Sequence, residues 1–280
     1  MLLTMVVMVG IDTVGKYLVQ FYPAPQVIWA RFAFNMLLMA LLLNRRFFEH
    51  LRTVRPGLQF LRSLLILATT VLYFGAIHYI PLADANAIMA LSPVIVTALA
   101  VPVLGERVGL HRWLAVAAGF AGAVIIIRPG LDVMNTASVV ILSAAFCNAL
   151  YQICTRLLSR SDPVLTILIH TGTLGVVATS AVAPFTWVTP DITGWALMVT
   201  MGALGSVGHF MLIKAYSYAP APAISPYAYS GLAWSALLGF GIFGDIPDAW
   251  TIIGALVIVA SGLYILHREH VRRHPAEETP

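Results

Sequence analysis

The sequence predicts an all-α polytopic membrane protein with ten transmembrane helices, arranged as two five-helix repeats of inverted topology. Hydrophobic residues make up 60% of the 280 positions and charged residues only 10%, whereas a soluble domain is about 45–50% apolar and about 25% charged. Apolar runs of about 20 residues, the length that crosses a bilayer, recur from end to end. Because these runs do not alternate in polarity, a transmembrane β-barrel is excluded.

Ten apolar segments are expected to cross the bilayer, and short connections rich in turn residues separate them. Proline marks many of these connections, as at Pro81, Pro163 and Pro190. The chain opens in an apolar segment without a basic leader or a small-residue cleavage site, so it is expected to begin with a span and not a signal peptide. The expected spans are 2–20, 25–43, 59–77, 82–103, 110–127, 137–157, 164–184, 192–213, 222–243 and 248–267.

A long stretch of the first half recurs in the second half. Tyr73–Val108 aligns without a gap on Leu212–Pro247, and the alignment places acidic Glu106 on acidic Asp245. Such internal similarity indicates a duplicated unit. We therefore expect a first five-helix repeat at 1–135, a second at 136–268 and a cytoplasmic tail at 269–280.

An odd number of spans in each repeat determines their relative orientation. The second repeat must enter the membrane from the opposite side, so a pseudo-two-fold axis in the membrane plane would relate the halves. Several secondary transporter folds are built in this way, with the solute bound near the midplane between the repeats. Two such halves can rock against each other and expose one site to each side in turn.

Basic residues set the expected orientation of the chain in the inner (plasma) membrane. Only Arg128 lies in one set of loops, whereas most Lys and Arg lie in the other. Cytoplasmic loops carry the excess of positive charge, so both termini are expected in the cytoplasm. The expected cytoplasmic set is Arg45, Arg46, Arg52, Arg55, Arg62, Arg107, Arg112, Arg156, Arg160, Lys214, Arg268, Arg272 and Arg273.

Three motifs of the first half resemble the EamA signature of the drug/metabolite transporter superfamily: Leu91–Val94, Gly105–Arg107 and Gly119–Gly122. Lys16 and Arg31 also look like that family's pattern. The resemblance covers both halves and implies a ten-span carrier, usually an exporter of amino acids, metabolites or drugs. The clustering of aromatic residues looks most like the YddG-type exporters of aromatic amino acids.

Ionisable groups inside spans are costly in lipid and usually face a wet cavity. Asp12 and Lys16 are four residues apart and share a helix face. They form either a self-neutralising pair or a carboxylate–ammonium pair that a zwitterionic solute opens. Arg31 could hold a solute carboxylate through two parallel hydrogen bonds. Its alternatives are pairing with Asp12 and snorkelling to the headgroups.

The second half carries hydrogen-bonding residues where the first half carries charges. The repeat alignment places His170 on the position of Arg31. A hydrogen-bonding wall is therefore expected from the face of the sixth span that carries Asn148, Tyr151 and Gln152. His78 and His209 are either donors or proton sites in the pathway, or histidines satisfied by nearby carbonyls.

Proline and aromatic residues complete the candidate site. Pro93 interrupts the fourth span, which predicts that this span faces the cavity and presents Asn86 and Ser92. An aromatic wall with a few polar groups suits a flat, amphipathic solute. The aromatic candidates are Tyr79, Tyr229 and Trp234.

These observations predict a secondary transporter that exports small amphipathic metabolites, above all aromatic amino acids, by alternating access. A proton-coupled exporter of drugs or nucleotide-like metabolites is the alternative. Lys16 should keep Asp12 ionised, which favours movement down a gradient over proton antiport. A channel would need a selectivity filter, and an enzyme a motif such as H-E-x-x-H; neither is present in the sequence. We expect a monomer in the lipid bilayer, with a small-molecule substrate and without nucleic acid, cofactor or metal.

Overall fold

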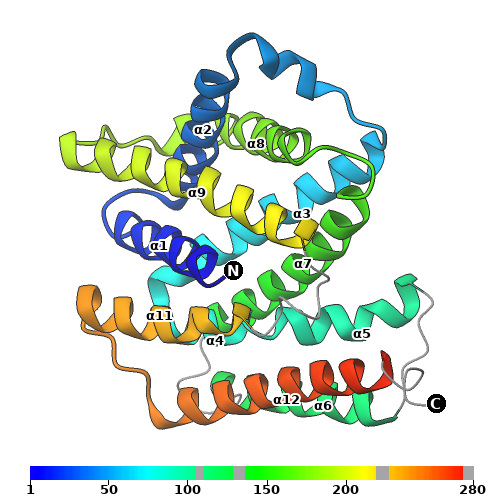
Figure 1. Cartoon of the computed structure of the whole chain (residues 1–280). Coiled ribbons are helices and arrows are strands. Elements are labelled where there is room, and N and C mark those ends of the chain that lie inside the picture. The colour runs from blue at the N-terminus through cyan, green and yellow to red at the C-terminus, as the bar shows by residue number, and fades with distance from the viewer. Residues whose placement is uncertain (105–109, 129–135, 219–226, 274–280) are drawn as a thin grey trace.

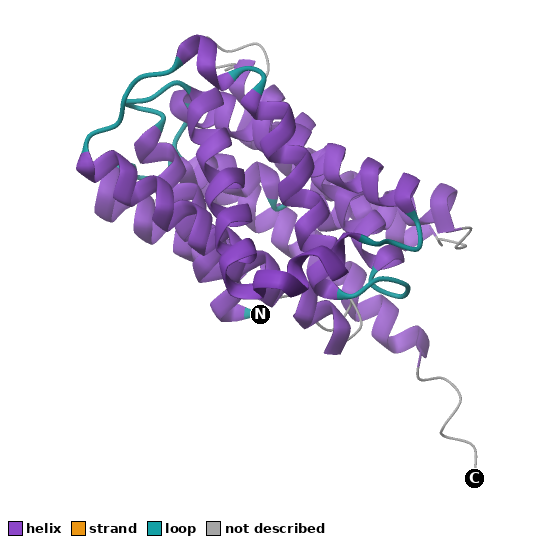
Figure 2. Cartoon of the chain, turned by 90° about the horizontal axis from the view of Figure 1, so that it is seen from above, coloured by secondary structure: helices purple, strands orange, loops and turns teal. Residues whose placement is uncertain are grey.

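The computed structural model describes residues 1–104, 110–128, 136–218 and 227–273, and the regular secondary structure of this part of the chain is entirely helical, without a strand. Figure 2 shows the helices and their short connecting loops. The prediction of an all-α fold is confirmed. The Gly105–Arg107 motif, including Glu106, lies outside the described residues.

The first half of the chain forms the helices that were expected there. Three of them carry proline in their first turn, where its missing N–H costs no helical hydrogen bond. A short 3₁₀ helix, η1, follows α2, and another, η2, follows α3. The bounds are α1 Leu2–Leu18, α2 Ala24–Leu43, η1 Asn44–Leu51, α3 Pro56–Ala76, η2 Ile77–Tyr79, α4 Leu82–Met89, α5 Ser92–Leu104 and α6 Leu110–Ile127.

The second half repeats this succession of helices. Its ninth expected span begins within residues that lie outside the description, and it ends in the π-helical turn η4. After η4, Gly244 has φ +70°, a left-handed conformation that glycine adopts without strain. The bounds are α7 Thr136–Leu158, α8 Val164–Ser180, η3 Ala183–Thr186, α9 Ile192–Tyr218, α11 Ser230–Leu238, η4 Gly239–Phe243 and α12 Ala249–Arg273.

The fourth span is broken, as Pro93 predicts. Helix α4 ends at Met89 and α5 begins at Ser92. Proline has no N–H to donate to the carbonyl one turn earlier, so a continuous helix would lose a hydrogen bond here. The hydroxyl of Ser92 donates instead to the carbonyl of Ala145 on α7, at 3.2 Å. The break therefore joins the fourth span to the sixth.

The packing of helices is symmetric under exchange of the two halves. Helix α3 packs on α7 as α9 packs on α1, and α2 packs on α9 as α8 packs on α3. Helices α2 and α8, α4 and α11, and α6 and α12 each pack on their own counterparts. Figure 1 shows α6 and α12 side by side along one edge of the molecule. Residues of both halves thus meet along the whole bundle.

Five of the described helical segments are long and apolar enough to cross a membrane, and four shorter apolar helices accompany them. Large apolar side chains cover the outside, with 69% of both Leu41 and Leu42 exposed. Such an exterior suits contact with lipid chains. The five long segments are Ala24–Leu43, Pro56–Tyr79, Leu82–Leu99, Thr136–Leu158 and Ile192–Ala215.

Helix α12 continues to Arg273, so the segment expected as a cytoplasmic tail from residue 269 begins as part of this helix. One sequence-based expectation needs correction. Arg62, which was counted with the basic residues of the cytoplasmic loops and span ends, is completely buried within α3. Counting charges by their position near a helix end could not show that the first turns of α3 are packed against α7 and α8.

Candidate functional site

A central cavity of about 230 Å³ lies between helices of both halves. It reaches Met1 at the start of α1, Leu212 near the end of α9 and Ala228 just before α11. The break in the fourth span lines it through Met89 and Pro93. Most of the residues proposed from the sequence line this cavity: Asp12, Arg31, Asn86, Ser92, Asn148, Tyr151, Gln152, His209 and Tyr229.

Arg31 forms a cationic part of the cavity wall. Its Nη1 donates to Thr70 Oγ1 at 3.1 Å, and its Nη2 lies 3.2 Å from His209 Nε2. The rings of Phe32 and Phe74 lie 5.8 and 5.6 Å from the guanidinium carbon, within the range of cation–π contacts. No ion pair among the described residues involves Arg31. The guanidinium therefore keeps N–H groups for a carboxylate in the cavity.

The partners of His209 determine its tautomer. Arginine can only donate hydrogen bonds, so Nε2 of His209 must accept from Arg31. The proton of the neutral ring then lies on Nδ1, which faces Tyr151 Oη at 3.4 Å. That oxygen also accepts from Arg62 Nη2 at 2.9 Å. Tyr151 is left with its own proton to donate, and Tyr151 lines the cavity.

Arg62 was not proposed for the site from the sequence. It lies outside the cavity lining and holds the lining residue Tyr151 in place through a hydrogen bond. It is fully buried and donates to Thr155, Thr171 and the carbonyl of Ile167, all outside the cavity lining. Its guanidinium also lies over the Tyr151 ring, 4.6 Å from the centroid. The signal that could have revealed it is its position as a basic residue just ahead of a long apolar run.

Asp12 provides the negative charge of the cavity. It is half-buried and lines the cavity together with Arg31, Tyr73 and Asn86. Asn86 Nδ2 donates to Tyr73 Oη at 3.1 Å and to the carbonyl of Leu82 at 3.2 Å. The cavity therefore presents one carboxylate and one guanidinium. Tyr73 is a lining residue absent from the proposed site set.

The broken fourth span and the sixth span together present polar groups to the cavity. Asn148 Nδ2 donates to Ser92 Oγ at 3.2 Å, and both residues line the cavity beside Gln152. Side chains of two different spans thus form one hydrogen-bonded wall. In the structure, residues of the interrupted fourth span and of the sixth span line the same cavity.

Apolar, polarizable side chains form the remaining lining. Met1, Met5 and Met8 follow one face of α1, and Met89 ends α4. Tyr229 contributes its ring, because its hydroxyl is buried against the backbone of Gly262 and has no hydrogen-bond partner in the described part of the chain. Methionine adapts to solutes of different shape. The spacing of the three methionines on α1 was the available sequence signal.

The predicted pairing of Lys16 with Asp12 is wrong. Its Nζ lies 2.5 Å from Asp245 Oδ2 and donates to the carbonyl of Ile80 at 3.0 Å. Lys16 is buried but does not line the central cavity. The helical spacing of four residues placed Asp12 and Lys16 on one face, but a long-range partner with a free carboxylate takes the ammonium group. The argument that Lys16 keeps Asp12 ionised therefore loses its basis.

Four other proposed residues lie outside the central cavity. His78 and Tyr79 line a separate cavity beside Lys16. Nδ1 of His170 lies 2.9 Å from the carbonyl of Thr166 in its own helix, the local arrangement expected of a structural histidine. Trp234 is 37% exposed on the outside of the bundle, because the inward face of α11 carries Gly231 and Ser235. Rotation of a helix about its axis is not readable from an apolar run.

Among the described residues, no group of three or more His, Cys, Asp or Glu side chains could hold a metal ion.

The EamA-like transporter family model matches residues 1–128 and 135–266. The chain is similar to the S-adenosylmethionine uptake transporter of Rickettsia prowazekii (strain Madrid E), with 28% identity over 92% of this chain and 88% of that protein. It is 31% identical to the riboflavin transporter of Vibrio cholerae serotype O1, over 79% of this chain and 75% of the other. The pseudopaline exporter CntI of Pseudomonas aeruginosa (strain UCBPP-PA14) is 28% identical, over 85% and 84%. A crystal structure at 15% identity shares the fold, with a TM-score of 0.65 over 98% of both chains.

Proposed function

Because this chain belongs to the EamA-like transporter family, we propose that it is a secondary transporter of small zwitterionic, amphipathic metabolites, moved by alternating access at the central cavity. The family is one of small-molecule transporters, and the chain is a multi-pass membrane protein. The observation that carries the proposal is the presence of one guanidinium, Arg31, and one carboxylate, Asp12, in the same cavity. An α-amino acid head group offers the opposite charge to each.

The apolar part of the cavity supports a solute with a flat or apolar tail. The ring of Tyr229 and the methionines of α1 lie beside the charged groups. Such a lining suits aromatic rings, which bury a large area and contact sulfur favourably. We therefore propose aromatic amino acids as the first solutes to test and S-adenosylmethionine, which also carries an amino acid head group, as the second. Riboflavin is the third solute to test. Because it lacks that head group, it shows whether the cavity requires a zwitterion.

The two repeats supply the proposed movement. We propose units at 1–135 and 136–268, related by a two-fold axis in the membrane plane, with both termini in the cytoplasm of an inner-membrane carrier. The symmetric pairing of helices across the halves supports this arrangement. The relatives are named for uptake and for export. Without coupling, the gradient of the solute sets the direction, so a solute made in the cell is exported.

A second candidate is a proton-coupled exporter of drugs or nucleotide-like metabolites. The observation that favours it is the separation of Asp12 from Lys16, which leaves a half-buried carboxylate in the cavity without an ammonium partner. Such a carboxylate can exchange a proton for a solute. An imposed pH gradient should then drive accumulation in vesicles, and Asp12→Asn should abolish the response to pH while exchange persists. Equal accumulation with and without the gradient would exclude coupling.

Counterflow in proteoliposomes tests the main proposal. Vesicles loaded with unlabelled solute should take up labelled tryptophan or S-adenosylmethionine transiently, whereas labelled riboflavin should not accumulate. Arg31→Ala should lower this exchange at least about tenfold, since hydrogen bonds to charged groups contribute about 1.5–3 kcal/mol.

Trp234→Ala is the matched control, because Trp234 faces the outside of the bundle and should retain exchange. Exchange of riboflavin alone would overturn the zwitterion proposal. Wild-type exchange by the Arg31 variant would remove the assigned site.

A further inference from the structure

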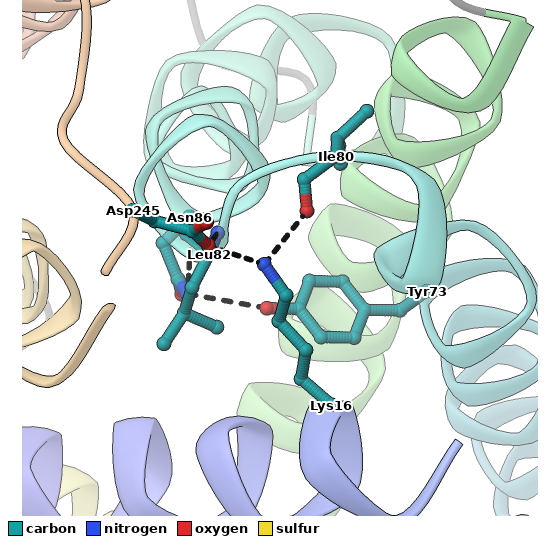
Figure 3. Close-up of polar contacts among 6 residues, drawn as sticks. All are labelled: Lys16, Tyr73, Ile80, Leu82, Asn86 and Asp245. Atoms are coloured by element: carbon teal, nitrogen blue, oxygen red, sulfur yellow. Dashed lines mark hydrogen bonds and ion pairs between the residues drawn. The ribbon is translucent and has the colours of Figure 1, made fainter. Parts of the chain in front are cut away.

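A buried ion pair closes the end of the bundle that lies beyond Asp12. Figure 3 shows the ammonium group of Lys16 held between the carboxylate of Asp245 and the carbonyl of Ile80. Asp245 Oδ2 also accepts from the backbone N–H of Leu82 at 3.4 Å. The aromatic ring of Phe243 lies 4.9 Å from Lys16 Nζ. The Lys16–Asp245 pair therefore connects three parts of the chain: the end of α1, the start of α4 and the segment after η4.

Two of these parts belong to the first half and one to the second. Lys16 lies at the end of α1, Leu82 begins α4, and Asp245 follows the left-handed Gly244 after η4. Lys16 and Asp245 are far apart in sequence, so neither half can form the contact alone. Relative movement of the halves at this end must break it or carry both partners together.

The ion pair also lies near two cavities. Asp12 lines the central cavity, and Lys16 lies one turn, about 6 Å, further along α1. On its other side is a cavity of about 460 Å³ lined by Lys16, Tyr17, His78, Tyr79, Phe243 and Asp245. Among the described residues, none lines both cavities. The Lys16–Asp245 pair lines the outer cavity, the Tyr73–Asn86 hydrogen bond lines the central one, and Figure 3 shows the two contacts close together.

The energetics of such a pair suit a contact that opens and closes. A buried pair contributes little net stability, because desolvation offsets much of its Coulomb attraction. Removing one partner is costly only while the other stays buried. Lys16 is 7% exposed in its side chain and Asp245 25%, so separation would return both charges to the polar outer cavity.

We infer that the Lys16–Asp245 ion pair is the gate of the carrier on the face opposite to Met1. It forms when the central cavity opens towards Met1 and breaks when the cavity opens towards His78 and Tyr79. The inference rests on alternating access in the proposed function but not on the identity of the solute.

Thiol labelling from each face tests the gate without a known solute. A probe cysteine, Ala90→Cys, is placed in the central cavity after Cys147 and Cys154 are replaced by Ala. A membrane-impermeant thiol reagent is applied to right-side-out and to inside-out vesicles. Lys16→Met and Asp245→Asn should each speed labelling from the gate face about tenfold or more and slow it from the Met1 face.

Restoring the pair distinguishes a gate from general damage. The exchanged variant Lys16→Asp with Asp245→Lys should return both labelling rates towards those of the parent. Asp248→Asn is the matched control, because its ion pair with Arg128 at 2.6 Å also joins the two halves, but neither residue lines the central cavity or the outer one. It should leave both rates unchanged.

Three results would overturn the inference. They are unchanged labelling in both single variants, faster labelling from both faces at once, and an exchanged variant as fast as the single ones. A loss of counterflow with the expected labelling would count against the proposed solute and leave the gate in place.

Discussion

Single residues in this protein owe their proposed roles to the groups around them. Arg31 is available to a solute because, among the described residues, its guanidinium contacts Thr70 and His209 and forms no ion pair with a carboxylate. Tyr151 donates into the cavity because Arg62 and His209 both direct hydrogens at its oxygen. A polar chain thus runs from the buried Arg62 to the cavity wall, and its end groups would contact the solute.

Removing the hydroxyl of Tyr151 should weaken both binding and folding. Tyr151→Phe leaves Arg62 Nη2 without its acceptor, and an unsatisfied buried donor costs about 1–3 kcal/mol. We expect a lower Tm in detergent and a higher KM for the exchanged solute, with a smaller effect on the maximal rate. Tyr218→Phe is the control, because its ring is 78% exposed and remains over Lys214. Equal Tm and KM in both variants would refute the role of the chain.

Helices and their breaks explain how the cavity is built. The interruption at Pro93 turns Ser92 towards Ala145 and Asn148, so two spans share one polar wall. At the edge of the bundle, α6 and α12 approach closely through glycines instead. Gly122 and Gly254 leave no room for a side chain between the two backbones.

A methyl group at this crossing should destabilise the protein. The Cβ of Gly122→Ala would lie 2.8 Å from the carbonyl oxygen of Gly254, and backbone atoms cannot move aside without shifting the helix. We expect a loss of about 1–3 kcal/mol, typical of overpacking. Gly75→Ala is the control, since nothing lies within 4 Å of its Cβ and the change favours α3. Thermal unfolding measures both, and a Gly122 variant as stable as the Gly75 variant would contradict the close approach.

Removal of the proline should alter movement more than stability. Pro93→Ala restores an N–H that can donate to the carbonyl of Met89 and join α4 to α5. We expect an unchanged or higher Tm together with slower exchange, because the cavity would lose the turn that presents Ser92. Pro163→Ala, at a helix start outside the cavity, provides the comparison. Wild-type exchange by the Pro93 variant would show that the break serves packing alone.

The whole molecule is organised by contacts between its halves. Each helix of the first half packs on the second half in a way that the exchanged pair reproduces. The central cavity draws on both halves, and so does the ion pair that closes it. A movement of one half against the other would therefore change access to the cavity at both ends.

Topology mapping tests the proposed orientation. Reporters that are active only outside the cytoplasm should be silent when fused at Met1 or Pro280 and active when inserted near Trp187, between η3 and α9. The physical reason is that ten crossings return the chain to its starting side. Reporters on opposite sides at the two termini would rule out the inverted repeat and, with it, alternating access by this symmetry.

The linear sequence was sufficient for properties that depend on neighbouring residues. Long apolar runs identify the spans, and Pro93 locates the break that lines the cavity. Polar side chains in those runs, such as Asp12 and Arg31, mark the cavity because lipid excludes them. Each of these properties follows from solvation or from backbone chemistry. None of them depends on residues that are distant in the sequence.

Which residues contact one another could be determined only from the tertiary structure. Lys16 pairs with Asp245 and not with nearby Asp12, Arg62 is buried beneath Tyr151, and Trp234 faces outwards. These outcomes depend on the rotation of each helix about its axis and on which helices pack together. Hydrophobic burial along a span favours many rotations nearly equally, so contacts between residues far apart in sequence decide among them.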